Sequence, residues 1–594
     1  MKRIERVELA LHAARKKIAL DKSQSESHKP QEGTLLTESG TATDTVGASS
    51  QSEATSPQAP SSGVHFAKLD FASNQAGEVD SFNGIPFFSG AGYSWVRFRT
   101  GAEPCYEKLY ALGPPWQDRC GGPARVPADD SPTPIAELKL PPKQTMEYLV
   151  STYCSSSFSL SFPIIDPVLF QHTLDAAYEP LSTEQPSKSV GAKACLFAFL
   201  SLKSKCGANW LFPPQMDGER YAAKAKSLVP EIFLEPSLVT FQTLFMLSLH
   251  YLLSGNIDRG MTLHAYSCRV LFSLGAHSQR LSTADDLQTD GARTDTQRMK
   301  KHLRQLFWMV YSLDKYITLR TGNPPTIDDD FCDLTLPEDS RGAAPSEAEG
   351  SNGSPNGSDT GHKPLLLWDL RLAILKSKVS KTLYSPSALR KTDVELLQNI
   401  RELDEELERW RMSLDPSCRP SLGFQGEKAF LIDQADDVHV SLQRNVKQFE
   451  YHYLLAAIHR ASGRCSSWAS GEPGDLTGIS SSIAISVQAS RMTIVHLHAV
   501  INFVAEEAFW LIVFYPVSAA LTVFCNVLLD PHNPQVDEDL QLIASVPYLI
   551  RRMPKGLSSV QDEGYLDKVD EFVAELVRLG NCAVARGSPN SEGK

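Results

Sequence analysis

Apolar residues recur at intervals of three and four positions through most of the chain, which is the spacing that one face of an α-helix requires. The pattern is clearest over residues 236–275, where it predicts two helices joined at Gly255. Over residues 297–318 it predicts one longer helix. Alternating strand patterns are scarce, so we predict an all-α body of stacked helical pairs across residues 141–582.

Two helix boundaries carry specific local signals. Asp166 precedes Pro167, and an aspartate N-cap followed by proline at the first helical position predicts a helix through Tyr178. The run Gly322-Asn323-Pro324-Pro325 ends the helix of residues 297–318, because proline lacks a backbone N–H and clashes with the preceding turn.

Charged residues lie directly before this second boundary. We expect Asp314, Lys315 and Arg320 to form a structural charge network that fixes the chain reversal, and contact with a ligand is the alternative. The residues of this expected structural motif are Asp314, Lys315, Arg320, Gly322, Pro324 and Pro325.

The N-terminal 20 residues contain a short heptad pattern. Its apolar positions alternate three and four residues apart, as in a coiled-coil seam. They are Ile4, Val7, Leu11, Ala14 and Ile18. About two heptads are visible, which is short for a coiled coil. Residues 1–20 are therefore expected to form a dimerisation helix, and a lone amphipathic helix is the alternative.

Several segments lack the apolar residues that a folded core needs. Residues 21–62 contain no Phe, Tyr or Trp, and Ser, Thr, Gln, Glu, Gly and Pro dominate them. Such a segment cannot offset its ordering entropy, so we predict a disordered linker. By the same argument residues 338–362 are a disordered insertion and residues 583–594 a tail. Residues 63–140 are expected to be irregular, rich in Pro and Gly, and docked on the helical body.

One uncharged segment, residues 508–529, is long enough to cross a lipid bilayer. Acidic residues flank it on both sides, and it contains Pro516, Thr522 and Asn526. The positive flank of a membrane helix is missing. We predict a buried helix pair in a soluble protein, with no membrane contact.

The composition restricts the function. The formal net charge is −12, so any contact with DNA must be local, because binding to phosphates needs clustered Lys and Arg. The 11 cysteines include no C-x-x-C pair, which is typical of reduced cysteines in an intracellular protein. Motifs of phosphate-binding loops and of catalytic serines are absent from the sequence. We predict that the chain is not an enzyme.

An all-α enzyme with a metal-diphosphate site at Asp329, Asp330 and Asp333 is the alternative from another class of protein. Its D-D-x-x-D pattern must lie on consecutive turns of one helix for the carboxylates to share a metal. Here the pattern follows Pro324 and Pro325. An acidic loop exposed to solvent is therefore the expected structure.

Histidines offer two further arrangements that could suggest a metal site. His496 and His498 point about 200° apart on a helix, so they cannot share one ion. His250, His264 and His277 lie on or beside the hairpin of residues 236–275, where packed or capping histidines are the commoner outcome. We predict no metal and no catalytic residues.

Three stretches in fixed order resemble the regulatory region of the fungal binuclear zinc-cluster transcription factors, the fungal-specific transcription factor domain. They are Phe162-Pro163-Ile164-Ile165-Asp166; the segments 221–225, 235–242 and 274–277; and the segments 306–308, 313–315, 320–325 and 336–337. Residues 4–18 resemble the family's dimerising helix, and residues 94–101 resemble a linker motif of some members. Met261 and Ala265 depart from the pattern, since the family often has Trp and Gly there.

The larger departure is the zinc cluster, whose six cysteines normally precede the heptads and are absent from this sequence. Either this sequence is a truncated version of a full factor, or the protein regulates without its own DNA reader. The chain itself then needs no cofactor, and zinc enters only with a missing N-terminal cluster.

The resemblance implies a nuclear regulator of DNA-templated transcription. Its promoter DNA would be reached through a missing zinc cluster or a partner's zinc cluster, in a homodimer or heterodimer, with a small-molecule effector as a further partner. A regulator that lacks DNA binding and acts by heterodimerisation is the second alternative.

Overall fold

A computed structural model describes the chain in fifteen stretches, and every structural statement below concerns these residues. They are residues 68–71, 74–79, 86–88, 90–109, 112, 134–179, 186–206, 217–233, 235–278, 295–337, 366–422, 438–465, 477–504, 506–554 and 560–587.

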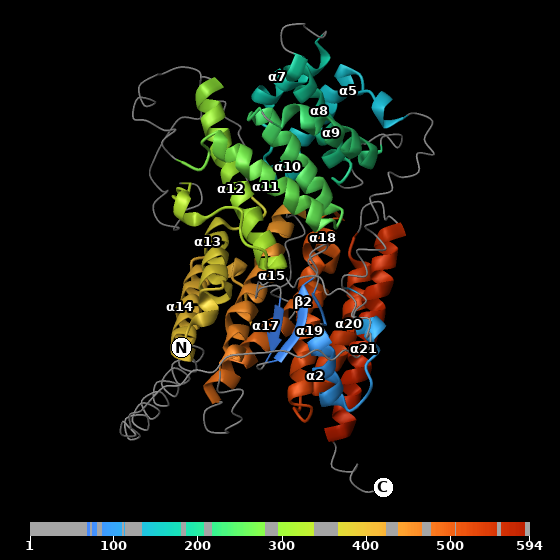
Figure 1. The fold of residues 1–594 in the computed structure, drawn as a ribbon, viewed down its shortest axis with the longest axis vertical. Coiled ribbons are helices and arrows are strands. Elements are labelled where there is room, and N and C mark those ends of the chain that lie inside the picture. The colour runs from blue at the N-terminus through green and yellow to red at the C-terminus, as the bar shows by residue number, and fades with distance from the viewer. Residues whose placement is uncertain are drawn as a thin grey trace, which may run out of the picture.

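One end of the molecule contains the first helices of the body (Figure 1). They are α5 (Lys143–Cys154), α6 (Ser157–Ser161), α7 (Pro167–Tyr178), α8 (Pro186–Lys203) and α9 (Gly218–Ile232). The Asp166 carboxylate accepts the backbone N–H groups of Val168 and Leu169, and Pro167 is the first residue of α7. The predicted helix start is confirmed.

The predicted hairpin consists of α10 (Leu238–Leu253) and α11 (Ile257–Ser273). Ser237 caps α10. Asn256 caps α11, and its side chain accepts the backbone N–H of Arg259. Gly255 joins the helices at φ 78°. A side chain at this position would also collide with the Trp510 ring, 2.6 Å from an ideal Cβ.

Helix α12 (Asp295–Thr321) extends beyond both predicted ends and packs on α11. Helix α12 also packs against α13 (Leu370–Val379), which lies beside α14 (Asp393–Met412) along one edge of the molecule (Figure 1). Thr392 and Glu395 form a capping box at the start of α14. Helix α12 therefore connects the two ends of the body.

The other end contains the remaining helices of the body (Figure 1). They are α15 (Val438–Arg460), α17 (Thr477–Val500), α18 (Phe509–Ile512), α19 (Phe514–Leu529), α20 (Val536–Arg552) and α21 (Val560–Gly587). Short turns connect the elements: η2 (Ile135–Glu137), η5 (Asp329–Phe331), η7 (Ser380–Tyr384), η8 (Ala388–Arg390), η9 (Pro416–Cys418), η11 (Ala461–Arg464), η12 (Ile501–Phe503) and η13 (Glu506–Ala508). The all-α prediction for the body is confirmed.

The apolar segment Phe509–Leu529 lies in the interior of this end. By length and composition it could cross a membrane, yet 94% of its most apolar window is buried inside the protein. A core helix has the same composition, and packing against α15, α17, α20 and α21 accounts for it here. The predicted buried helices are confirmed.

A small sheet precedes the body, in the region where irregular structure was expected. Strands β1 (Lys68–Phe71), β2 (Asn74–Val79) and β3 (Pro86–Phe88) pair antiparallel in the order β1-β2-β3. Helices α2 (Gly90–Thr100) and α3 (Tyr106–Leu109) follow. The sheet escaped prediction because its strands are short and Gly and Asn interrupt their alternation.

Residues 86–109, which we call the N-terminal strap, lie against the C-terminal helices (Figure 1). Phe88 is buried and packs against Phe524 and Phe572. The distances between the ring centres are 5.7 and 6.3 Å. The Glu575 carboxylate accepts the backbone N–H of Cys105 at 2.8 Å. Arg586 donates to the carbonyl of Phe98 at 2.6 Å. The strap and α21, far apart in sequence, form one packed unit.

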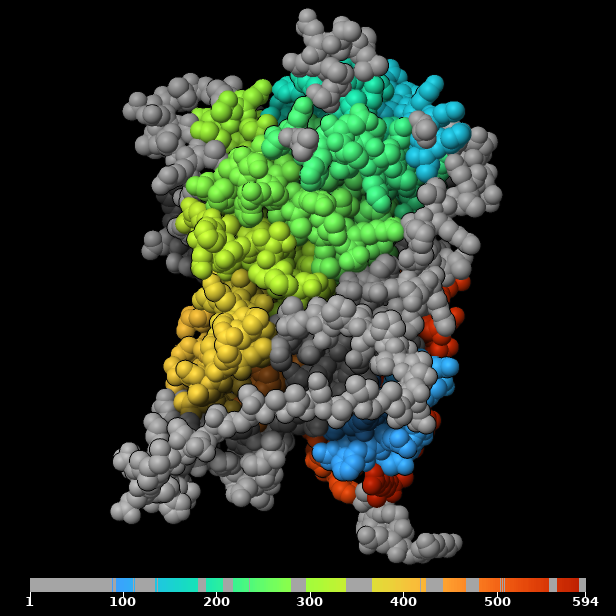
Figure 2. All heavy atoms as spheres, viewed as in Figure 1, coloured from blue at the N-terminus to red at the C-terminus, as the bar shows by residue number. Residues whose placement is uncertain are grey.

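One large hydrophobic cluster extends through both ends of the body and includes residues of the strap. Figure 2 shows α8–α11 in green gathered at one end and α21 in red at the other, beside the strap in blue. Because the cluster is continuous, the described helices share a common core.

Candidate functional site at the end of helix α12

Helix α12 ends in a sharp chain reversal. Gly322 follows its last residue, Thr321, at φ 73°, a left-handed conformation that glycine adopts without strain. The backbone N–H of Gly322 donates to the Thr318 carbonyl at 2.9 Å. Pro324 and Pro325 follow at exposed positions and prevent the helix from continuing.

Asp314 holds the returning segment against α12. It is 2% exposed, and its carboxylate accepts the backbone N–H groups of Thr326 at 2.9 Å and Ile327 at 3.2 Å. Burial alone would raise the pKa of Asp314, but the adjacent His264 and the Lys315 charge bring it below its ordinary value. Ionised Asp314 thus fixes two backbone groups of the reversal.

Lys315 is also buried, and its ammonium group has four close partners. The ammonium donates to the Ile327 carbonyl at 2.5 Å and lies 3.1 Å from Asp329 Oδ1. It is 3.4 Å from Asp314 Oδ2 and 4.8 Å from the centre of the Tyr311 ring. Such pairing offsets the large cost of removing an ammonium from water.

The expectation of a solvent loop is wrong for Asp329. Its side chain is 22% exposed and accepts the Tyr311 hydroxyl at 3.1 Å in addition to pairing with Lys315. Burial, and after it the charge of Asp329, raises the pKa of Tyr311. The two prolines turn the chain back onto α12, so a segment that looks solvated in sequence covers a buried lysine.

The remaining acidic residues of this run pair with other cations. Asp330 lies 2.9 Å from Lys381, and both side chains are exposed. Asp333 lies 4.0 Å from Arg304. The described residues contain no group of three His, Cys, Asp or Glu arranged to hold a metal ion. The geometry thus gives no support to a metal-diphosphate site at Asp329, Asp330 and Asp333.

Arg320 belongs to a separate network. Its guanidinium donates to the Tyr316 hydroxyl and to the Trp510 carbonyl, both at 2.7 Å. It also lies 5.3 Å from the centre of the Phe514 ring. Asp314 and Lys315 therefore contact the returning segment, whereas Arg320 connects α12 to α18 and α19.

The histidines singled out in the sequence have separate partners. His250 contacts the Ser201 carbonyl at 3.0 Å and Glu219 at 3.3 Å. His264 lies 3.6 Å from Asp314, and the His277 ring packs on Phe272. These three histidines do not share a site.

His496 and His498 lie on different faces of α17, as predicted: His496 is buried and His498 exposed. The ring of His496 lies 6.2 Å from that of His452, which is also buried.

A buried Ser-His-Asp arrangement escaped the sequence reasoning. His459 Nδ1 is 2.8 Å from Ser482 Oγ, and its Nε2 is 3.3 Å from Asp404 Oδ1. All three side chains are at most 2% exposed, so a substrate cannot reach the Ser482 hydroxyl. The arrangement joins α14, α15 and α17. Its members lie on three separate helices, and no local motif connects them.

A buried ion pair between Lys376 of α13 and Glu450 of α15 escaped prediction for the same reason. Both side chains are 1% exposed. Burial lowers the pKa of Lys376 and raises that of Glu450. Like the other networks, this pair fixes the orientation of two helices.

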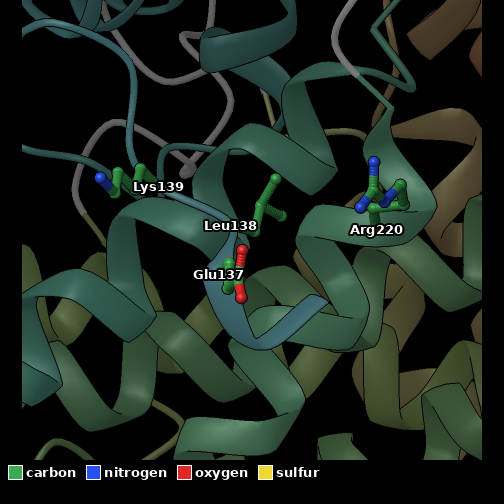
Figure 3. Close-up of a pocket in the computed structure, with 4 residues that line it drawn as sticks. All are labelled: Glu137, Leu138, Lys139 and Arg220. Carbon is green, nitrogen blue, oxygen red and sulfur yellow. The ribbon is translucent and has the colours of Figure 1, made fainter. Parts of the chain in front are cut away.

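A hollow of about 550 Å³ lies on the surface, between η2 and α9 (Figure 3). Glu137, Leu138, Lys139 and Arg220 line it, and Lys139 points away from Arg220 (Figure 3). Glu137 and Lys139 are exposed. Because the charged side chains diverge, the hollow offers no convergent set of groups to a ligand.

The predicted dimerisation residues Ile4, Val7, Leu11, Ala14 and Ile18 lie outside the described residues, as do the linker of residues 21–62 and the insertion of residues 338–362. Their roles stay predictions.

By its fold, the chain is a large all-α protein of packed helical hairpins with buried polar networks between them. Residues 153–412 match the model of the fungal specific transcription factor domain. This match contains the hairpin, α12 and the reversal with Asp314 and Lys315. Residues 153–412 therefore match this domain, as the sequence motifs indicated.

Curated relatives are named as transcription factors or as a transcriptional regulatory protein. An ABC-transporter-regulating transcription factor of Aspergillus oryzae is 26% identical over 91% of this chain and 59% of its own length. A protein of the same name from Aspergillus fumigatus is 26% identical over 97% of this chain and 62% of its own length. An uncharacterized transcriptional regulatory protein of Schizosaccharomyces pombe is 25% identical over 47% of this chain and 32% of its own length. No solved structure matches the chain.

Proposed function

We propose that the chain is the regulatory body of a nuclear transcription regulator. The observation that carries this proposal is the match to the fungal specific transcription factor domain over residues 153–412, together with relatives named as transcription factors. The chain spans 59% and 62% of the length of the two Aspergillus relatives, so the activity of the whole protein extends beyond what the match covers.

The regulator acts on promoter DNA through a zinc cluster that is either its own, encoded before Met1, or a partner's. In both cases the body lies beside the DNA-binding zinc cluster because the chain dimerises. The residues of the dimer interface are Ile4, Val7, Leu11, Ala14 and Ile18. The N-terminal strap supports this arrangement, because it leads the chain from the N-terminal side directly onto α19 and α21. A conformational change in the helices of the body would then alter the direction in which the N-terminal segment leaves the body.

The test is a tethered reporter assay. The full chain is fused to an unrelated DNA-binding module, and reporter transcription is compared with that of the module alone. We expect transcription to change about tenfold or more in either direction, which separates a regulator from an inert passenger. Equal transcription from the fusion and from the bare module, at equal protein levels, would contradict the proposal.

Dimerisation is tested separately. Leu11→Asp introduces a charge into the predicted seam, and Ala13→Asp introduces the same charge outside it. We expect sedimentation to show dissociation for Leu11→Asp alone. If the dimer persists in Leu11→Asp, or if both variants dissociate, the seam is wrongly assigned.

Heterodimerisation is the second candidate function, in which the zinc cluster belongs to a partner. Co-purification with a relative that contains a zinc cluster, lost in Leu11→Asp and retained in Ala13→Asp, is the expected outcome for this alternative.

A further inference from the structure

Helix α18 lies where the α10–α11 hairpin meets the C-terminal helices (Figure 1). It has only four residues, Phe509–Ile512, and packs against α10 on one side and α19 on the other. The match to the fungal specific transcription factor domain ends at residue 412, well before α18. This short helix therefore connects the hairpin of the matched part to the C-terminal part of the body.

Trp510 of α18 packs directly on the turn of the hairpin. An ideal Cβ at Gly255, which joins α10 to α11, would lie 2.6 Å from two atoms of the indole ring and 2.9 Å from a third. The ring thus rests on the backbone of the turn with no free space between them. Because a closely packed interior transmits strain, a displacement of the turn toward the ring must move Trp510.

The backbone of α18 is held by α12. Arg320 donates to the Trp510 carbonyl at 2.7 Å, and the Tyr316 hydroxyl donates to the Leu511 carbonyl at 2.9 Å. Both donors are buried. Since these two bonds oppose a shift of the helix as a whole, a push from the hairpin turn acts on the indole side chain.

The indole of Trp510 also packs against α21. Its ring lies 4.9 Å, between centres, from the ring of Tyr565, which is 1% exposed. Phe572 and Glu575, further along α21, contact the N-terminal strap. A movement of the indole therefore reaches the helix that anchors the strap.

We propose that Trp510 is a mechanical link that transmits a displacement of the hairpin turn to α21 and the N-terminal strap. A partner or an effector that moves the hairpin then changes how firmly the strap is held. The link deepens the proposed function, and its regulatory meaning rests on that function. The link itself is measured without DNA or transcription, so its failure would leave the tethered reporter assay unaffected.

The test is hydrogen exchange of the full chain under native conditions, followed by mass spectrometry. Gly255→Ala pushes a methyl group into the indole ring at a backbone φ of 78°. Gly275→Ala is the matched control, because Gly275 has a φ of 75° and an ideal Cβ there meets nothing within 4 Å. Both variants thus introduce the same backbone strain, but only Gly255→Ala displaces Trp510.

We expect the amides of residues 86–109 to exchange at least about fivefold faster in Gly255→Ala than in Gly275→Ala. The amides of α5, at the other end of the body, are the internal reference and should exchange alike in both variants. Equal exchange of the strap in the two variants would overturn the proposal.

The same change is repeated in a Trp510→Ala background, where the added methyl group has space. Gly255→Ala should then speed exchange of the strap by less than about twofold. If it still speeds exchange about fivefold, the displacement bypasses Trp510, and the proposal is wrong.

Trp510→Ala by itself removes the contact with Tyr565 and should speed exchange of the strap at least about fivefold. Trp410→Ala is its control, because Trp410 is 6% exposed and packs on Tyr451, away from α21. Exchange of the strap should stay within about twofold of wild type in Trp410→Ala. Wild-type exchange of the strap in folded Trp510→Ala would overturn the proposal even if Gly255→Ala failed to fold.

Discussion

The ammonium of Lys315 lies 3.1 Å from the carboxylate of Asp329, on opposite sides of a chain reversal that contains two consecutive prolines. Lys315 is 1% exposed, whereas Asp329 is partly open to solvent. The returning segment thus supplies both a carbonyl, from Ile327, and a carboxylate to one buried cation. This relationship explains why Lys315 stays buried although a proline-rich segment ends α12 close to it.

Asp329→Asn is expected to lower the free energy of unfolding by about 1–3 kcal/mol, because a charged hydrogen-bond partner of a buried lysine is lost. The loss stays below that of a fully buried pair, since Asp314 and the Ile327 carbonyl still contact Lys315. Urea denaturation followed by circular dichroism is the measurement.

Asp330→Asn is the matched control for this change. Asp330 pairs with Lys381, but both side chains are more than half exposed, and exposed pairs contribute about 0–1 kcal/mol. Equal stability of the two variants would show that Asp329 does not support Lys315. A loss of more than about 3 kcal/mol in the free energy of unfolding of Asp330→Asn would show that Asp330 and Lys381 do not form an exposed surface pair.

Phe245 of α10 and Phe307 of α12 should be central to the core, since both are 0% exposed. Phe245→Ala or Phe307→Ala is expected to cost about 3–5 kcal/mol, the range for truncating a buried aromatic residue. Phe331→Ala, at a side chain that is 79% exposed, is the control and should change stability little. Chemical denaturation gives the free energy of unfolding of each variant. A similar loss in all three variants would contradict the burial of Phe245 and Phe307 in the core.

The stability should depend on pH through His452 and His496. Burial lowers the pKa of His452 to about 4, and burial and the neighbouring His452 lower that of His496 to about 3. In the unfolded chain both titrate near about 6.5. The folded state therefore binds fewer protons, so stability is complete above about pH 6.5 and falls as the pH drops from there toward 4 and 3.

Each histidine should contribute about 2 kcal/mol to the loss between pH 7 and pH 5, at 1.4 kcal/mol for each pH unit below the unfolded pKa. His496→Gln should remove its share of this dependence. His498→Gln, at the exposed position two residues later, should leave the dependence unchanged. Denaturation midpoints are measured at steps of half a pH unit. Identical pH profiles for wild type and His496→Gln would show that His496 does not contribute to the pH dependence of stability.

The N-terminal strap should detach when its anchor is removed. Phe88→Ala deletes the ring that contacts Phe524 and Phe572, so residues 86–109 should become more accessible to protease. Phe98→Ala, on the same strap but 74% exposed, should keep the wild-type pattern. Limited proteolysis with mass spectrometry is the measurement. Unchanged cleavage in Phe88→Ala would mean that the polar contacts of Glu575 and Arg586 hold the strap alone.

Residues 1–594 should bind duplex DNA only weakly and without sequence preference. Their most basic stretch, residues 1–20, lies within a chain of net charge −12. Non-specific affinities of about 10⁻⁴ to 10⁻⁶ M are expected at physiological salt. A mobility-shift titration tests this, and sequence-specific binding tighter than about 10⁻⁷ M would show that the chain reads DNA itself.

The sequence by itself determined helices of the body, several of their ends and the resemblance to the fungal specific transcription factor domain. Helical periodicity, the N-cap Asp166 and the breakers Gly255, Gly275 and Gly322 act within a few residues, so local chemistry suffices to place them. The family motifs are likewise short and ordered along the chain. The N-terminal sheet was missed because its brief strands carry little alternation.

Only the tertiary structure decided which charges are buried and with what. Asp329 and Asp330 are adjacent in sequence, yet one supports a buried lysine and the other an exposed one. The partners of His459 and Lys376 come from distant helices, as does the docking of the strap on α21. Burial and pairing depend on which surfaces meet when helices pack, and sequence periodicity indicates a helix's buried face but not the residue opposite it.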